Sequence, residues 1–254
     1  MAADAALLDW VSLGPARLVF RTYGWDRPTL SLGRSEPFPA GWDERALSRE
    51  GIAVARRPTG GNAVLHWEEV TFALAATLPG PWRLTPRGFA NEAAEALAEA
   101  LRGCGVNAAR VDAARPRPAP ARPGEAPCFA RIESGEVGAV GYKVAGLASR
   151  FSRTGALCHA SVPLSARHRE IVSFRSDGAQ AEASLASGAR SIGELLGFPS
   201  HAAGLADRLA QDLADRLAEA VAARFGVCLV EAPFSMLGLE EEPAVFTGPR
   251  ARGL

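Results

Sequence analysis

The sequence predicts an α+β fold, with helices and strands mixed along the chain. Three observations favour this class. The 254 residues are 48% hydrophobic and 22% charged, which is the composition of an ordinary globular protein. Segments with helical hydrophobic periodicity alternate irregularly with short apolar segments that are typical of strands. No strand–helix–strand unit recurs, so an α/β protein with a regular parallel sheet is not expected.

Helices are predicted at residues 2–11, 91–102, 191–196 and 205–225. Asn91 is a suitable N-cap for the second helix, and Gly103 is a suitable stop. The last helix has the clearest pattern, because an apolar residue recurs at every fourth position between residues 205 and 221. Gly226 follows it as a C-terminal cap. We expect the apolar stripe of this helix to pack in the core.

The apolar segments between the helices are predicted to form strands, one of them a short strand ending at Gly33. The other expected strands cover residues 17–23, 52–57, 63–66, 70–78, 106–111, 138–149, 156–162 and 170–174. Residues 113–127 contain too many prolines for regular structure, so an exposed loop is expected there. Because strand-like segments continue after this loop, we expect residues 1–254 to form a single domain.

The overall charge and the cysteine pattern argue against several classes of protein. The 28 basic and 28 acidic residues balance to a net charge of +0, whereas a protein that binds nucleic acid by bulk charge needs a basic excess. No apolar run of about 18 residues is present, so a membrane-spanning helix is not expected. The N-terminal segment contains acids but no basic region, unlike a secretory signal. The four cysteines are widely spaced, which favours the reducing cytoplasm and predicts no zinc or other metal site.

Lys143 is unusual because the other 27 of the 28 basic residues are arginines. Arginine replaces lysine readily on a solvated surface, but it does not replace a compact ammonium in a confined site. Lys143 lies in the segment GYKVAG, between two glycines and among apolar residues. In a pocket its ammonium could stabilise negative charge on a carbonyl oxygen or a carboxylate. Composition alone leaves open the alternative of a surface lysine.

Cys128 follows the Pro-rich segment directly, where solvent access is expected. Most free cysteines are small buried hydrophobic residues, and Cys104 and Cys228 fit that description. A reactive thiol needs a nearby cation or base, such as Lys143 or a histidine. Position alone leaves both possibilities open for Cys128.

The segment RRPTGGNAVLH, residues 56–66, joins two predicted strands through a glycine-rich turn. Gly60 and Gly61 allow backbone to approach a ligand closely, although an ordinary β-turn is the alternative. The segment is neither a Walker loop nor a dinucleotide-binding fingerprint. His159 lies on another predicted, mostly apolar strand, where a histidine is more often a hydrogen-bonded structural residue than a catalyst. The neighbouring Cys158 should point to the opposite face of that strand.

Several of these segments together, in this order, resemble the lipoate-protein ligase A and octanoyltransferase family, which is related to biotin ligase. The segments are MAADAALL, YGWDRPTLSLG, RRPTGGNAVLH, GYKVAG and GALCHASVPL, and they span roughly residues 2–165. The resemblance implies a single α+β domain of the biotin/lipoate transferase type, with mixed β-sheets and packed helices.

A Cys-Phe pair 15 positions before the lysine, here Cys128 and Phe129, resembles the LipM-type octanoyltransferases. The resemblance implies that Cys128 and Lys143 are catalytic. It also implies a group of substrate-binding residues around an apolar acyl channel, in which the glycines would form the walls. This group comprises Arg57, Gly60, Gly61, His66, Gly146 and His159.

The implied reaction is ping-pong transfer of an octanoyl group from acyl carrier protein, through a thioester on Cys128, to a lysine of a lipoyl domain or a glycine-cleavage H protein. No cofactor is required, because one thioester replaces another. An ATP-dependent lipoate ligase is an alternative, in which ATP and Mg are needed and Lys143 binds the carboxylate. A non-catalytic acyl-binding or partner subunit is another, suggested by departures from the family pattern. These departures lie at Asn62, Trp67, Glu68, Glu69, Ser149, Cys158 and residues 130–135.

Overall fold

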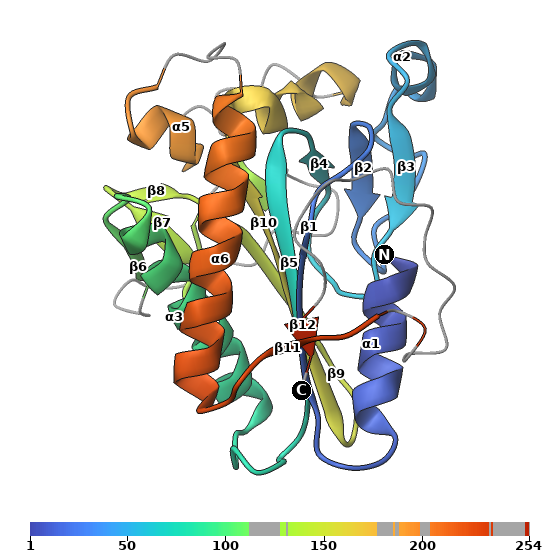
Figure 1. Ribbon diagram of the computed structural model, residues 1–254. Coiled ribbons are helices and arrows are strands. Elements are labelled where there is room, and N and C mark those ends of the chain that lie inside the picture. Colours follow the sequence, from blue (N-terminus) through green and yellow to red (C-terminus); the bar gives the residue numbers. More distant parts are fainter. Residues whose placement is uncertain are drawn as a thin grey trace.

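A six-stranded antiparallel sheet runs through the middle of the protein (Figure 1). The computed structural model describes residues 1–111, 128–130, 132–176, 185, 188–198, 204–233, 235 and 252–253. The strand order is β11-β12-β1-β5-β10-β9. The strands are β1 (Leu18–Tyr23), β5 (Glu69–Thr77), β9 (Gly146–Phe151), β10 (Gly155–Pro163), β11 (Val230–Glu231) and β12 (Arg252–Gly253).

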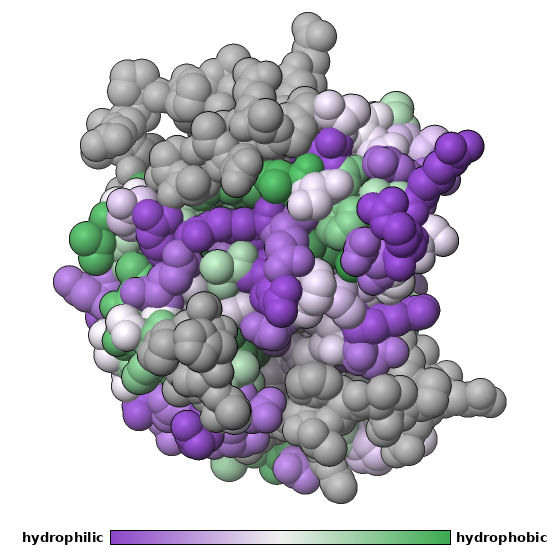
Figure 2. Space-filling model, turned by 90° about the horizontal axis from the view of Figure 1, so that it is seen from above, coloured by the Kyte–Doolittle hydropathy of each residue, from purple (hydrophilic) through white to green (hydrophobic). Residues whose placement is uncertain are grey.

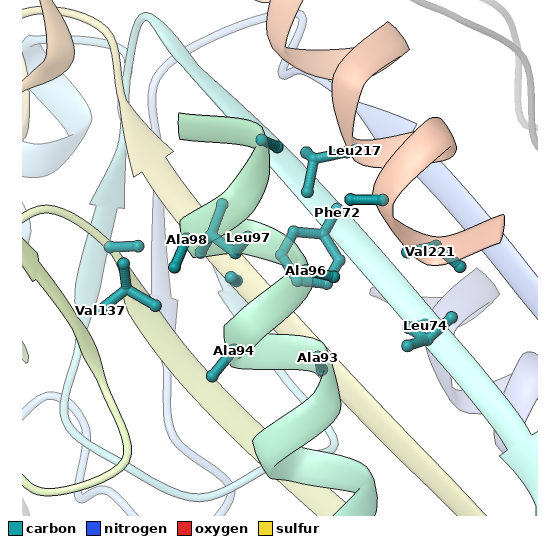
Figure 3. Close-up of a cluster of buried hydrophobic side chains, with 14 of the residues drawn as sticks. Phe72, Leu74, Ala93, Ala94, Ala96, Leu97, Ala98, Val137, Leu217 and Val221 are labelled. Carbon is teal, nitrogen blue, oxygen red and sulfur yellow. The ribbon is translucent and has the colours of Figure 1, made fainter. Parts of the chain in front are cut away.

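Helices cover both faces of this sheet, and for that reason β5 and β10 are apolar along almost their whole length. On one face, Phe72 and Leu74 of β5 pack against α3 (Pro86–Gly103) and α6 (Leu205–Phe225) (Figure 3). On the other face, alternate β5 residues pack against α1 (Ala2–Ser12). A strand buried on both faces loses the hydrophobic alternation of a half-exposed strand.

The predicted long helices are present, with one corrected boundary. Leu213, Leu217 and Val221 of α6 are fully buried, and Gly226 ends the helix with a φ of +62°, as expected. The prediction of Asn91 as an N-cap is wrong. The helix α3 begins at Pro86, because the Thr85 side chain accepts a hydrogen bond from the Gly88 backbone N–H and Pro86 occupies the first turn.

The smaller elements include other differences from the sequence prediction. Residues 170–174 are not a strand but belong to the 3₁₀ helix η2 (Ala166–Phe174), which begins after Ser165. The helix α2 (Glu44–Arg49), capped by Asp43, was not predicted. The predicted helix at residues 191–196 is present as α5 (Ile192–Leu195), with Ser191 and Glu194 forming a capping box.

Two three-stranded sheets flank the central one. The first contains β2 (Thr29–Leu32), β3 (Ala53–Arg56) and β4 (Val64–His66), and the second contains β6 (Ala108–Arg110), β7 (Val137–Ala139) and β8 (Tyr142–Lys143). The predicted strand at residues 138–149 is therefore divided among β7, β8 and β9. The predicted loop at residues 113–127 lies outside the described residues, and a single domain of residues 1–254 stays a prediction.

Gly33, at the end of β2, lies against the glycine turn. A Cβ atom at Gly33 would lie 1.9 Å from the Gly61 carbonyl oxygen, so only glycine fits there. Gly61 itself has a φ of +89°, which glycine adopts without strain. The two glycines therefore bring the turn at residues 58–61 against the end of β2.

Hydrophilic side chains cover much of the described surface seen from above, with smaller hydrophobic areas between them (Figure 2). Within the described parts of the chain, we find no helix that combines the length and the apolar character needed to cross a membrane.

Candidate active site

Cys128 and Lys143, 15 residues apart in the sequence, lie side by side. Cys128 begins the short 3₁₀ helix η1 (Cys128–Ala130), and its backbone N–H donates a hydrogen bond to the Ala63 carbonyl beside β4. The Lys143 Nζ lies 3.5 Å from the Cys128 Sγ and donates to the Cys128 carbonyl oxygen at 2.8 Å. The structure thus brings together the two residues that the sequence singled out for chemistry.

The Lys143 ammonium is held in its charged form although only 2% of the residue is exposed. Burial lowers the pKa of Lys143, but the electrostatic interactions with Cys128 and Glu136 and the hydrogen bonds to them outweigh this effect and raise the pKa above its ordinary value. Glu136 accepts a hydrogen bond from Nζ at 2.6 Å. Burial in turn raises the pKa of Glu136, although Lys143 opposes the shift. Nζ thus has three acceptors, and its contact with the Cys128 Sγ is the longest of the three, at 3.5 Å.

A cavity lies beside the Cys128 thiol. It contains about 380 Å³ of space not occupied by atoms, part of which is open to solvent. The polar side chains in its wall include those of Arg57, His66 and His159. Small or apolar residues form much of the remaining wall, namely Gly61, Val64, Gly146, Leu147, Ala148 and Ala160.

Gly146 determines how much room is left at the sulfur. A Cβ atom at this position would lie 3.2 Å from the Cys128 Sγ and 3.4 Å from the Phe129 ring, closer than most side chains approach. Gly61 also lines the cavity, as expected for a wall residue. Gly60 does not line it: this residue lies on a neighbouring depression, and its carbonyl oxygen accepts hydrogen bonds from Arg57.

Arg57 holds the glycine turn in place from inside. Its guanidinium donates to the carbonyl oxygens of Ser31, Gly60 and Asn62 at distances of 2.7 to 3.2 Å. Burial lowers the pKa of Arg57, and electrostatic interactions with Cys128 and Glu36 oppose that shift. An arginine stays protonated in such a site, so Arg57 adds a second cation near Cys128.

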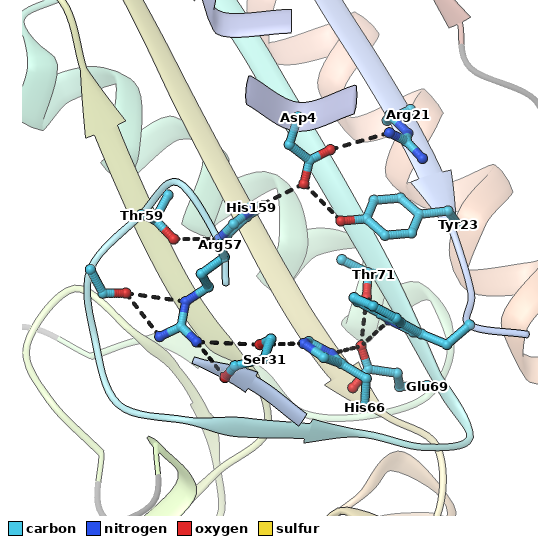
Figure 4. Close-up of polar contacts among 12 residues, drawn as sticks. Asp4, Arg21, Tyr23, Ser31, Arg57, Thr59, His66, Glu69, Thr71 and His159 are labelled. Atoms are coloured by element: carbon cyan, nitrogen blue, oxygen red, sulfur yellow. Dashed lines mark hydrogen bonds and ion pairs between the residues drawn. The ribbon is translucent and has the colours of Figure 1, made fainter. Parts of the chain in front are cut away.

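Each cavity histidine lies between an acid and a hydroxyl group (Figure 4). The ring nitrogens of His159 lie 3.2 Å from the Asp4 carboxylate and 2.7 Å from the Thr59 hydroxyl. Burial raises the pKa of Asp4, but the hydrogen bond with His159 and the charge of Arg21 prevail and lower it to about 2. Asp4 is therefore ionised.

His66 has the same type of environment as His159. Its Nδ1 lies 2.7 Å from the Glu69 Oε1, and its Nε2 lies 2.6 Å from the Ser31 Oγ. The sequence did not identify the acid and hydroxyl partners of the two histidines, nor Glu136, as site residues. Glu69 stands in the sequence only as a departure from the family pattern. Nothing in the sequence relates Asp4 to His159, 155 positions away.

Cys158 points away from the cavity, as the strand alternation predicted. Its side chain is 1% exposed and packs in the core, and burial raises the pKa of the thiol to about 11. Among the residues that the structure describes, no cluster of three or more histidine, cysteine, aspartate or glutamate side chains could hold a metal ion.

Residues 1–214 match the family of lipoyl protein ligase A/B catalytic domains. The chain belongs to this family. Family members similar in sequence include the octanoyltransferases LipM of Kyrpidia tusciae and Anoxybacillus flavithermus. The first is 37% identical over 171 residues, covering 65% of this chain and 61% of that protein. The second is 32% identical over 182 residues, covering 65% and 60%.

A shorter match of 43% identity over 81 residues relates the chain to octanoyltransferase LipM of Geobacillus kaustophilus, covering 32% of this chain and 29% of that protein. The chain thus spans about three fifths or less of the length of these three relatives.

Solved structures of lipoate-protein ligases share the fold. A bi-partite lipoate protein ligase from Thermoplasma acidophilum superposes with a TM-score of 0.67 at 18% identity, covering 89% of this chain and 78% of that one. A lipoate-protein ligase A bound with ATP gives a TM-score of 0.64 at 18% identity, covering 89% and 79%. The predicted α+β fold of the lipoyl protein ligase family is therefore confirmed.

Proposed function

We propose that this protein is an octanoyltransferase. It transfers an octanoyl group from acyl carrier protein to Cys128, and then from Cys128 to a lysine of a lipoyl domain or a glycine-cleavage H protein. The observation that carries the proposal is the 3.5 Å contact between the Cys128 Sγ and the Lys143 Nζ at the wall of a partly apolar cavity. The similarity to octanoyltransferases of the LipM type supports it.

In the first half-reaction, the Cys128 thiolate attacks the carbonyl carbon of the octanoyl thioester. A new C–S bond forms, the bond to the carrier sulfur breaks, and the carrier leaves as a thiolate that takes up a proton from solvent. The Lys143 ammonium stabilises both the thiolate and the negative charge that develops on the carbonyl oxygen. Backbone N–H groups near Gly61 would also donate hydrogen bonds to the negatively charged carbonyl oxygen. One donor of this kind typically contributes about 3 kcal/mol to transition-state stabilisation.

In the second half-reaction, the amine of the acceptor lysine attacks the acyl-Cys128 thioester. An amide forms and Cys128 is released. Because a thioester is exchanged for a thioester and then for the more stable amide, the proposal requires no ATP, no metal and no other cofactor. His66, His159 and Arg57 line the cavity that would hold the acyl chain, and Gly61 and Gly146 would keep it open.

A depression beside the glycine turn offers a place for the carrier. Arg34 and Arg150 line it together with Gly60, and neither arginine forms an ion pair within the described residues. The arm that presents an acyl group on the carrier contains an anionic phosphodiester, which complements two guanidinium groups. The proposal also places the protein in the cytoplasm, because all four cysteines carry free thiols.

An ATP-dependent lipoate ligase is the alternative on the same fold. In that case Lys143 would bind the lipoate carboxylate and the acyl-adenylate. The contact between Lys143 and Cys128 favours the transferase, because a ligase needs no nucleophilic thiol.

Mass spectrometry of the protein mixed with octanoyl-acyl carrier protein tests the proposal. We expect a thioester adduct on Cys128 that is absent in Cys128→Ala and that disappears when a lipoyl domain is added. Formation of AMP from ATP and free lipoate, without an adduct, would establish the ligase instead. Acyl-chain binding without any turnover would indicate a non-catalytic subunit.

A further inference from the structure

The open edge of the central sheet connects the cavity with the depression beside the glycine turn. Among the described strands, β9 is the last of the six-stranded sheet and pairs with β10 alone. Residues 146–148 of β9 line the cavity, and residues 149–151 line the depression. The glycine turn has the same division, because residues 58–60 lie on the depression and Gly61 lies on the cavity. The two hollows therefore adjoin each other along β9.

The hydrogen bonds between β9 and β10 leave every second residue of β9 with backbone groups that point away from β10. The Ser152 N–H donates to the Gly155 carbonyl oxygen at 2.8 Å, and these two residues continue the ladder in which Phe151 faces Ala156. In an antiparallel ladder, facing residues that exchange hydrogen bonds alternate with facing residues that do not. The even-numbered residues of β9 therefore bond to β10. The backbone N–H and C=O groups that point to the open edge are those of Leu147, Ser149 and Phe151.

These edge groups have no partner within the protein. In the part of the chain that the structure describes, no hydrogen bond joins the backbone of Leu147, Ser149 or Phe151 to another residue. The Leu147 side chain packs in the core on the far face of the sheet, and Ser149 lies opposite Cys158, which is on the same far face. A strand edge of this kind binds an extended chain through backbone hydrogen bonds.

The donor of the proposed function carries a chain of matching chemistry. Its acyl group is attached to a pantetheine arm, which contains two amides and ends in a phosphodiester. Counted along the bonds of an extended arm, the two amide nitrogens lie about 3.5 and 8 Å from the thioester sulfur, and the phosphorus lies about 15 Å from it. The arm thus has peptide-like groups at its near end and a negative charge at its far end.

The strand β9 offers partners at nearly the same intervals. Gly146 is level with the Cys128 sulfur, because a Cβ atom on this glycine would lie 3.2 Å from Sγ. A strand advances about 3.4 Å per residue, so Leu147, Ser149 and Arg150 lie about 3, 10 and 14 Å further along β9. Two edge residues therefore fall near the two amides, and the guanidinium of Arg150 falls near the phosphodiester.

We propose, on the basis of the proposed function, that the open edge of β9 binds the pantetheine arm of the donor. The amide next to the thioester pairs with the backbone of Leu147, the second amide pairs with the backbone of Ser149, and the phosphodiester binds Arg150 and Arg34. The arm lies along the side of the strand, so the cavity over the face of the sheet stays free for the acyl chain. After the acyl group has moved to Cys128, the arm leaves and the entrance is open to the acceptor lysine.

A series of octanoyl thioesters tests this assignment with the wild-type protein. The donors are the thioesters of N-acetylcysteamine, which has the first amide only, of pantetheine, which has both amides, and of phosphopantetheine, which adds the phosphate. Acylation of Cys128 is followed by mass spectrometry. We expect the second-order rate constant of acylation to rise about 10-fold at each step. Equal rate constants for the three donors would overturn the inference and leave the proposed function intact.

A pair of variants at Ser149 tests the backbone contact directly. Ser149→Pro removes the N–H that points to the edge, and proline is tolerated on an edge strand at such a position. Ser149→Ala keeps this N–H and removes only the hydroxyl, so it is the matched control. With the pantetheine donor, Ser149→Pro should acylate Cys128 about 5-fold or more slower than Ser149→Ala does. With the N-acetylcysteamine donor, the two variants should react at equal rates.

Two results with these variants would contradict the assignment. Slowing of Ser149→Pro relative to Ser149→Ala by the same factor with both donors would show a distorted strand instead of a lost contact with the arm. Equal acylation of the two variants by the pantetheine donor, together with slower transfer from Cys128 to a lipoyl domain in Ser149→Pro, would assign the edge to the acceptor. If the wild type forms no thioester on Cys128 with any of the three donors, the proposed function itself fails.

Discussion

Replacing Lys143 with methionine removes one charge and keeps most of the packing. The substitution leaves Glu136 without its 2.6 Å partner in a place where its side chain is only 15% exposed. Breaking a buried ion pair typically costs 3–5 kcal/mol, and a lower value of about 3 kcal/mol fits the residual exposure of Glu136. For a chain of this length, that cost corresponds to a loss of roughly 6–12 °C in melting temperature.

The loss of stability in Lys143→Met should depend on pH. Burial already raises the pKa of Glu136 above its ordinary value of 4.5, and without Lys143 nothing comparable opposes the shift. A carboxyl group with a raised pKa in the folded state costs little stability while it is protonated, and stability falls as the pH rises through that pKa. The variant should therefore lie close to wild type near pH 4.5 and fall furthest below it at pH 8.

A double variant separates folding from chemistry. Lys143→Met combined with Glu136→Gln removes both charges, so most of the stability at pH 8 should return. Transfer of the octanoyl group should stay about 100-fold or more below wild type in both variants, because the donor to the thiolate and the oxyanion is gone. Thermal melts at pH 4.5 and pH 8 and an acyl-transfer assay measure these effects. A Lys143→Met protein with wild-type stability at pH 8 and ordinary transfer would refute the reasoning.

Four further predictions concern Lys143, Gly146, His168 and Arg150. Lys143→Arg should lose transfer about 100-fold or more, because the broad guanidinium does not fit a fully enclosed position. Gly146→Ala should fold normally but acylate Cys128 about 10-fold more slowly, because its methyl group crowds the sulfur. Burial lowers the pKa of His168 to about 4, so the free energy of unfolding of the wild type should fall by about 3 kcal/mol between pH 6.5 and pH 4. His168→Leu should abolish this loss of stability. Arg150→Glu should raise KM about 10-fold for the carrier-bound donor but not for a small thioester.

Acyl-transfer kinetics check the two active-site variants, and ordinary activity of Lys143→Arg or of Gly146→Ala would contradict the geometry at the sulfur. Denaturant unfolding as a function of pH checks His168→Leu, whose stability should fall less steeply in acid than that of wild type. An equal rise in KM for both donors in Arg150→Glu would show that the depression does not contact the carrier. The rise in KM of Arg150→Glu for the carrier-bound donor should also become smaller as salt is added.

Local sequence together with the family resemblance located Lys143 and Cys128. Lys143 stood out because every other basic residue is an arginine, whereas the position of Cys128 at a loop edge left its role open until the resemblance gave meaning to its distance from the lysine motif. Arg57 and His66 belong to one short motif, so proximity along the chain already implied proximity in space. The long helix at residues 205–225 was equally evident, because its apolar period of four is a property of consecutive residues.

Errors occurred where two local signals competed. Asn91 and Thr85 are both acceptable caps, and the chain uses Thr85 because Pro86 fits the first turn of a helix. Gly60 and Gly61 are neighbours in one turn, yet of the two only Gly61 lines the cavity, since the direction of each residue in a turn depends on what the turn packs against. Residues 170–174 have strand-like composition but continue the 3₁₀ helix η2.

The sequence by itself determined the fold class, the two long amphipathic helices and the family resemblance, and that resemblance paired a single lysine with a particular cysteine. Only the tertiary structure decided what surrounds that pair. Glu136 accepts a hydrogen bond from the ammonium, and each histidine has an acid at one ring nitrogen and a hydroxyl at the other. The physical reason is that periodicity and composition act over neighbouring residues. A contact between Ser31 and His66, or between Asp4 and His159, depends instead on strand register and on the way a helix packs against a sheet.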